Sequence, residues 1–138
     1  MGQFGFLIAL ALWPAERTSS DLAATISWIL FVVAAVLLTL AAIPLWPSLT
    51  VRPEPKEGPF ITRGIYRWVR HPMYTAVLTI GIGLYLGKPS VMMLVLLVAL
   101  MWVMFTKATY EDAFLRAKWP PAADYQRRVG MFFPKLGR

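Results

Sequence analysis

Uncharged, mostly apolar stretches alternate with short charged segments along this chain. The longest stretch runs from residue 22 to residue 46 and contains no charged side chain. At ~1.5 Å per helical residue it is long enough to cross a hydrocarbon core of ~30 Å. Ser20 and Asp21 offer helix N-cap chemistry just before it, and Pro44 and Pro47 indicate its end. We therefore expect one full membrane span here.

Two further apolar runs predict a helical hairpin. They cover residues 72–87 and 90–106, and the sequence Gly87-Lys88-Pro89-Ser90 where they meet is a turn signal. Each run is short for a full crossing, but flanking helical turns can lengthen it. The apolar residues 2–13 predict a short, tilted first helix that pairs with the long span. The expected fold is thus all-α, a polytopic membrane bundle of about four helices in one domain.

Charged residues gather in two segments on either side of the hairpin. The loop 47–71 holds five Lys or Arg and two Glu, and the tail 107–138 holds seven Lys or Arg and three acidic residues. Two crossings separate the loop from the tail, so both lie on one side of the membrane. The positive-inside rule makes that side the cytoplasm. We therefore expect a cytoplasmic loop, a helical cytoplasmic tail, and a bacterial or archaeal cell membrane as the location.

The composition excludes several classes of protein. The 138 residues are 58% hydrophobic and only 15% charged, which is unusual for a soluble domain. The formal net charge of +7 could suggest nucleic acid, but basic residues beside apolar spans set membrane orientation instead. Cysteine is absent and histidine occurs once, so disulfides are excluded and a catalytic zinc site is not expected. We expect no nucleic-acid partner and no metal, and the oligomeric state stays open.

Candidate chemistry gathers at the start of the hairpin, in the sequence RGIYRWVRHPMY, residues 63–74. Pro72 suits the first position of a helix, which makes His71 the cap residue, with Arg70 just before it. A helix N-terminus presents unpaired N–H groups and a partial positive charge, so this boundary attracts anions. Interface anchoring is the alternative explanation for any one of these residues. The other cations and aromatic faces are Arg63, Arg67, Tyr66, Trp68 and Tyr74.

Carboxylates gather at the other end of the hairpin sequence. Residues 107–119, KATYEDAFLRAKW, remain compatible with a helix until Pro120 and Pro121 end it. Antiparallel packing brings His71 and Glu111 to the same cytoplasmic end, about 9 Å apart in height at ~1.5 Å per residue. A ligand that carries both an anion and a cation would bridge them. The alternative is a solvated acidic pair, Glu111 and Asp112.

These elements resemble the superfamily of isoprenylcysteine carboxyl methyltransferases and phospholipid methyltransferases, which are integral membrane enzymes. The pattern of that superfamily runs GxYRxxRHPxYxG, then EExxL, then YxxYxxxVxxFxP, and the resemblance covers residues 61–134. In this chain the second Glu is Asp112, the last Gly of the first element is Ala76, and the first Tyr of the last element is Ala122. The resemblance implies methyl transfer that depends on S-adenosylmethionine.

The resemblance also implies site residues and an acceptor. Glu111 would help to hold the methyl donor or orient the acceptor, and Arg128 would pair with a carboxylate acceptor, so these two are the predicted catalytic residues. The acceptor is expected to be a lipophilic small molecule or a membrane lipid with a carboxylate, amine or thiol. The predicted cofactor-binding residues are Arg70, His71, Pro72, Tyr74, Glu111, Asp112 and Tyr125.

Three other functions remain as alternatives. A non-catalytic membrane scaffold or assembly protein would retain the same fold. A transporter would require ionisable groups near the middle of the membrane, and the apolar spans offer none. A reductase using a nicotinamide cofactor would require a phosphate-binding loop, which the sequence does not contain.

Overall fold

Every regular element in the described part of the chain is helical. The computed structural model describes Gly5, Ile8, residues 20–44 and residues 61–135. The all-α prediction is confirmed for these residues. The predicted helix 2–13, but for Gly5 and Ile8, and the first part of the predicted loop 47–71 lie outside them. The elements are α2 (Asp21–Ala42), the short 3-10 helix η2 (Gly64–Arg67), α3 (Pro72–Gly87), α4 (Val91–Lys118) and α5 (Ala122–Arg128).

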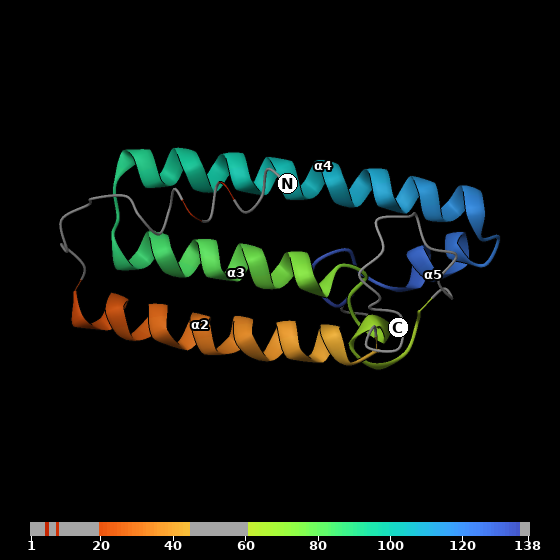
Figure 1. Cartoon of the computed structure of the whole chain (residues 1–138), viewed down its shortest axis with the longest axis horizontal. Coiled ribbons are helices and arrows are strands. Elements are labelled where there is room, and N and C mark those ends of the chain that lie inside the picture. The colour runs from red at the N-terminus through yellow and green to blue at the C-terminus, as the bar shows by residue number, and fades with distance from the viewer. Residues whose placement is uncertain (1–4, 6–7, 9–19, 45–60, 136–138) are drawn as a thin grey trace.

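The three long helices lie side by side as one layer, with α3 between α2 and α4 (Figure 1). α3 runs antiparallel to both neighbours, and its backbone approaches that of α2 more closely than that of α4. The predicted hairpin is confirmed, because α3 and α4 are joined by the short turn at Lys88–Ser90. α4 continues past the start of α3 to Lys118, so its last turns, together with α5, form one end of the layer.

Helix boundaries follow the capping signals of the sequence. Ser20 Oγ accepts a hydrogen bond from the Ala23 N–H at 3.3 Å, and Ser90 Oγ accepts one from the Met93 N–H at 3.2 Å. The long span ends at Ala42 rather than at residue 46 as predicted, and the next two residues form a 3-10 turn. Pro44 explains the early end, because its ring excludes the helical geometry and supplies no N–H.

Small residues let α2 and α3 approach closely. Ser27, Ala34 and Ala41 are buried on one face of α2 at intervals of seven residues. Ala76 and Gly83, also seven residues apart, are buried on α3. Small side chains at a helix interface bring the two backbones together and increase van der Waals contact, which is a common mode of packing in membranes.

A buried stripe along α4 forms the centre of the molecule and leads to its polar end. Met93, Leu100 and Met104 make up the hydrophobic core cluster. One turn further along the same face lies Ala108, which is also buried, and one turn after that lies Asp112. The helical repeat that buries the core therefore places a carboxylate inside the protein at the end of the layer.

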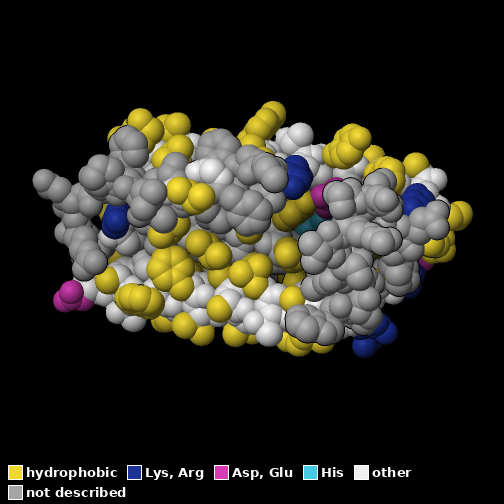
Figure 2. Space-filling view, viewed as in Figure 1, with side chains coloured by type: hydrophobic (Ala, Val, Ile, Leu, Met, Phe, Trp, Pro, Cys, Tyr) yellow, Lys and Arg dark blue, Asp and Glu magenta, His cyan; other side chains and the backbone are white. Residues whose placement is uncertain are grey.

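Two helices, α2 and α4, are long and apolar enough to cross a membrane, and the 16-residue α3 is a shorter apolar helix. Large apolar side chains are exposed along the outer faces of the layer, among them Trp28 and Trp102. Figure 2 shows this apolar surface along the helices, with Lys and Arg gathered mostly toward the end where α4 and α5 meet. This distribution suits a membrane protein with one polar end.

Candidate functional site

The segment after α5 runs alongside the residues that precede α3. The Arg70 N–H donates to the Gly130 carbonyl at 2.9 Å, and the His71 N–H donates to the Met131 carbonyl at 3.0 Å. We call residues 129–134 the tail strap. Because these bonds join backbone to backbone, they fix the path of the tail strap past His71 whatever side chains it carries.

Two aromatic rings enclose the His71 imidazole. Thr75 Oγ1 donates to the Phe132 carbonyl at 2.9 Å, which anchors the tail strap over the first turn of α3. The Phe132 ring centroid lies 6.4 Å from that of His71, and the Tyr74 ring stacks almost parallel to the imidazole at 5.4 Å. His71 is the N-cap residue of α3, with Pro72 at the first helical position, as the sequence predicted. The imidazole is consequently buried and held in one orientation.

Asp112 lies at the centre of a buried polar cluster. Its Oδ2 pairs with Arg70 Nη1 at 2.5 Å, and its Oδ1 lies 3.0 Å from His71 Nε2. Gln126 Nε2, from α5, donates to the Asp112 backbone carbonyl at 2.9 Å. We call these four residues the Asp112 cluster. A carboxylate that is only 4% exposed requires such partners, because an unpaired buried charge is strongly destabilising.

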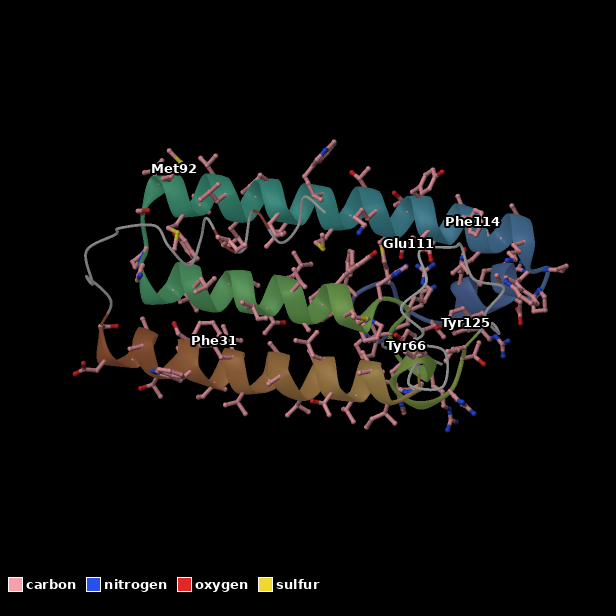
Figure 3. All side chains as sticks on the ribbon, viewed as in Figure 1. Phe31, Tyr66, Met92, Glu111, Phe114 and Tyr125 are labelled. Carbon is pink, nitrogen blue, oxygen red and sulfur yellow. The ribbon has the colours of Figure 1, made fainter. Side chains whose placement is uncertain are left out.

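Glu111 lies at the open edge of the same cluster. The Tyr74 hydroxyl donates a short hydrogen bond to Glu111 Oε1, and Oε2 lies 3.6 Å from His71 Nδ1. The Glu111 side chain is 45% exposed. Lys107 Nζ sits over the Tyr74 ring, 5.3 Å from its centroid. Figure 3 shows Glu111 on α4, on the side of that helix that faces the rest of the cluster. Glu111 is thus the more solvent-accessible of the two neighbouring carboxylates.

The predicted height difference of about 9 Å between His71 and Glu111 is measured along the helix axes, and their side chains approach to 3.6 Å. Side chains on a helix tilt toward its N-terminus. In α4 this tilt carries Glu111 back toward the hairpin turn. His71 precedes the first turn of α3, so its side chain reaches the same level from the opposite direction. Both effects shorten the distance that a count of residues along the helix axes predicts.

Two predicted residues of the tail belong to α5, and Tyr125 is close enough to Arg70 and Asp112 to be affected by their charges. Arg128 is exposed and pairs with Asp124 at 2.5 Å, one helical turn away in α5. The Tyr125 hydroxyl donates to the Tyr66 carbonyl at 2.6 Å, which ties α5 to η2. Burial is the main cause that raises the pKa of Tyr125 to about 12. The structure therefore brings Arg70, His71, Tyr74, Glu111 and Asp112 together, but not Arg128.

A cavity of about 450 Å³ adjoins the Asp112 cluster. Its lining has both signs of charge, with Asp112 opposed by three arginines. Arg70 Nε is buried and has no hydrogen-bond partner within the described residues. The space is thus large enough for a small molecule and offers both cationic and anionic groups to it. The lining residues are Arg70, Thr109, Asp112, Arg116, Ala123, Gln126, Arg127 and Met131.

Sequence reasoning did not assign Arg116, Gln126 or Arg127 to the site. One signal was available for Arg116, which follows Asp112 by four residues and so lies on the same face of α4, one turn beyond the end of the buried stripe. The opposite face of that helix, with Tyr110, is exposed. No comparable signal marks Gln126 or Arg127, because their position depends on where α5 folds back after the two prolines.

Comparison with known proteins places most of this chain in one family model, described as phospholipid methyltransferase, which matches residues 23–121. The chain is 35% identical over 95 residues to the cobalt-zinc-cadmium resistance protein CzcN of Cupriavidus metallidurans. That alignment covers 67% of this chain and 43% of the relative, so the chain spans less than half the length of that protein. No solved structure gives a significant match.

Proposed function

The chain belongs to the phospholipid methyltransferase family, in the superfamily that includes the isoprenylcysteine carboxyl methyltransferases, and we propose that it transfers a methyl group from S-adenosylmethionine to a lipophilic acceptor. The observation that carries this proposal is the cavity of about 450 Å³, lined by charges of both signs, beside the Asp112 cluster. It lies at the polar end of a layer of apolar helices. A soluble donor and a membrane-bound acceptor can meet at such a boundary.

The cavity fits S-adenosylmethionine in size and in charge. Small-molecule sites usually enclose about 300–1,000 Å³, and this cavity of about 450 Å³ falls in that range. The donor carries a carboxylate, an ammonium group, a sulfonium and an adenine ring. Arg116 and Arg127 offer positive charge to the carboxylate, and Asp112 offers negative charge to the ammonium. The unpartnered Arg70 Nε adds a further hydrogen-bond donor.

Bound S-adenosylmethionine supplies an electrophilic methyl group on a sulfonium, so the protein needs to position two reactants and exclude water. Arg70, His71 and Gln126 hold Asp112 in place. The tail strap covers His71 and shields it from solvent. These contacts preorganise the donor side of the site before any acceptor arrives.

Glu111 is the residue that acts toward the acceptor in this proposal. It lies at the open edge of the cluster and is oriented by the Tyr74 hydroxyl. Toward an amine it accepts the proton that methylation releases. It accepts the proton of a thiol acceptor in the same way, whereas a carboxylate acceptor is already ionised and requires no base. We propose that the acceptor approaches laterally from the bilayer, between helices, and reaches the exposed side of Glu111.

The cytoplasmic orientation of the site belongs to the same proposal. Arg70, Arg116 and Arg127 lie at the end of the layer where the basic loop and tail meet. The positive-inside rule places that end in the cytoplasm, where S-adenosylmethionine is made. Arg128, which was predicted to pair with a carboxylate acceptor, would first have to leave its ion pair with Asp124. The neighbouring Arg127 lines the cavity already.

A non-catalytic scaffold is the second candidate. Arg70, His71, Asp112 and Gln126 bond to one another, as they would if they only fastened α3, α4 and α5 together. The name of the relative concerns resistance to cobalt, zinc and cadmium. In the described ranges of this chain, no group of three His, Cys, Asp or Glu side chains could hold a metal ion, so metal binding is not part of either candidate.

Calorimetry with S-adenosylmethionine on the detergent-purified protein separates the two candidates. We expect saturable binding by the unmutated chain. Arg116→Ala and Arg127→Ala, which both remove a charged group from the cavity lining, should each weaken it about tenfold, the cost of one charge-assisted hydrogen bond, and His71→Ala, which removes a partner of Asp112, should weaken it strongly. Tyr110→Ala, on the exposed face of α4, is the matched control and should bind normally. Absence of heat with the folded, unmutated protein would favour the scaffold.

A transfer assay completes the test. The unmutated protein should move a labelled methyl group from S-adenosylmethionine into a total lipid extract, and Glu111→Gln should lower the initial rate by at least about 100-fold if it acts as the base. A rate unchanged in Glu111→Gln would rule out that role while leaving donor binding intact. The labelled lipid, once isolated, identifies the acceptor.

A further inference from the structure

A second cavity lies between α2 and α3 at the opposite end of the layer, near the turn that joins α3 to α4. Its volume is about 230 Å³. Trp28 and Phe31 line it from α2, and Leu84 lines it from α3. Lys88 is the charged residue that borders it. This cavity shares no lining residue with the one beside the Asp112 cluster.

Small residues create the cavity, and one tight contact closes it. A Cβ atom added to Gly87 would make an ordinary van der Waals contact of 3.6 Å with Ser27 Oγ, so the two helices are not tightly packed at this level. A Cβ atom on Gly83 would lie 2.8 Å from Phe31 Cε1, so there the helices touch. The Phe31 ring is held edge-on by Trp28, at 5.9 Å and 88°. The hollow therefore begins near Lys88 and ends at Phe31.

Lys88 places a positive charge beside this apolar hollow. It is the C-cap residue of α3, and within the described residues none of the ion pairs involves it. Asp21, the described acidic residue at the same end, does not line the cavity. A cation above an apolar cavity complements a molecule with an anionic head and a hydrocarbon chain.

We propose that this cavity binds an anionic phospholipid, with one acyl chain between α2 and α3 and the phosphate against Lys88. The walls from Ala24 to Phe31 span ~10 Å along the helix, about a third of a hydrocarbon core of ~30 Å. The cavity therefore holds the part of one acyl chain that is nearest the headgroup. Trp28 is of the residue type that favours the membrane interface. This binding does not depend on methyl transfer at the other end of the layer.

Quenching of Trp28 fluorescence by brominated lipids tests the proposal. Trp28 is kept as the single tryptophan by changing the others to Phe, and the full chain is reconstituted in phosphatidylcholine vesicles. Brominated phosphatidylglycerol or brominated phosphatidylcholine is then added in increasing mole fraction. One lysine near the headgroup gives about a fivefold preference for an anionic lipid over a zwitterionic one. We therefore expect half-quenching at a mole fraction of phosphatidylglycerol about fivefold lower than that of phosphatidylcholine.

Three variants in the same background separate headgroup binding from general lipid contact. Lys88→Gln should abolish the preference, and Lys118→Gln, at the far end of α4, should keep it. Gly87→Leu should fill the hollow and reduce quenching by both lipids, with helix content checked by circular dichroism. Equal quenching by the two lipids would overturn the proposal, and would indicate that Lys88 serves only the C-terminal dipole of α3. Protection of Trp28 from both lipids would also overturn it, because protein would then cover the cavity.

Discussion

At the scale of single residues, Asp112 and Glu111 are neighbours with opposite environments. Asp112 continues the buried stripe of α4 and has three polar partners. Glu111 lies one position to the side, which turns it toward the edge of the cluster, where it is half exposed. One step along a helix rotates a side chain by ~100°, so adjacent carboxylates serve different purposes here. Asp112 is held by buried partners, and Glu111 is open to solvent on one side.

Asp112→Asn should destabilise the protein by about 3 kcal/mol, because it leaves the buried Arg70 guanidinium without a counter-charge. Glu111→Gln should cost less than about 1 kcal/mol, because that side chain is half exposed and the amide oxygen of glutamine can still accept the hydrogen bond from Tyr74. The free energy of unfolding in mixed micelles measures both. The double variant Arg70→Met with Asp112→Leu should recover much of the loss, since a packed apolar pair replaces a buried ion pair. Equal effects of the two single variants would contradict this division of roles.

Much of the polar cluster could be predicted from the sequence, because most of its residues belong to two short segments. Arg70, His71 and Tyr74 share one short segment, and Glu111 and Asp112 are adjacent, so a hairpin alone brings these five together. Gln126 and Arg127 reach the site only because the tail strap follows a particular path. Backbone hydrogen bonds fix that path, and such bonds leave no pattern in the side chains.

At the scale of helices, the contact between α2 and α3 depends on the absence of side chains. Gly83 receives the Phe31 ring, whose Cε1 would lie 2.8 Å from an added Cβ atom. Gly87 lies one turn further on, where the nearest atom would be 3.6 Å away. The two glycines are alike in sequence context but differ in the space around them.

Gly83→Ala should therefore destabilise the protein by about 1–3 kcal/mol, the usual cost of overpacking. Gly87→Ala is the matched control and should be close to neutral, because its methyl group meets only ordinary van der Waals contact. Thermal unfolding in detergent distinguishes them. Adding Phe31→Leu to Gly83→Ala should restore stability by removing the ring edge. If both alanine variants unfold at the same temperature, the contact at Phe31 is not tight in solution.

The helices were predictable from the sequence, but which helix faces pack against each other was less predictable. Uncharged length, Pro72 and the turn at Lys88 were enough to define α2, α3 and α4 to within a few residues. Which faces meet could not be derived from hydrophobic periodicity, because the faces toward lipid are as apolar as those toward protein. The seven-residue spacing of Ser27 and Ala34 is the signal that carries this information. The predicted pairing of α2 with residues 2–13 stays a prediction, since only Gly5 and Ile8 of that segment are described.

At the scale of the whole molecule, two tyrosines connect segments that are far apart in sequence. The Tyr125 hydroxyl donates to the Tyr66 carbonyl, and the Tyr66 hydroxyl donates to the Ala41 carbonyl at 3.5 Å. This chain of bonds joins α5, η2 and the end of α2, and Figure 3 shows Tyr66 and Tyr125 close together there. Each hydroxyl is the donor in its bond, so the bond requires the protonated phenol. Burial raises the pKa of both hydroxyls.

Stability should therefore fall at alkaline pH. Tyr125 keeps its proton in the folded protein to a pKa of about 12, whereas an unfolded chain loses it near pH ~10. Below pH ~10 both states are protonated and stability does not change. Between that pH and about 12 only the unfolded state releases the proton, so stability declines as the pH rises.

Melting temperatures measured from pH 9 to 12 should show this decline in the unmutated protein and a shallower one in Tyr125→Phe. Part of the decline should remain in that variant because Tyr66 contributes as well. Tyr110→Phe, at an exposed position, should follow the unmutated curve. A Tyr125→Phe curve identical to that of the unmutated protein would show that this hydroxyl is not coupled to folding.

The tail strap has a consequence for the order in which the protein is made. Residues 129–132 are synthesised after all three long helices. They nevertheless cover His71, which is synthesised almost sixty residues earlier. A nascent chain can thus insert its helices while the pocket is still unfinished. A product of premature termination just after Lys118 would lodge in the bilayer and lack the residues that complete the site.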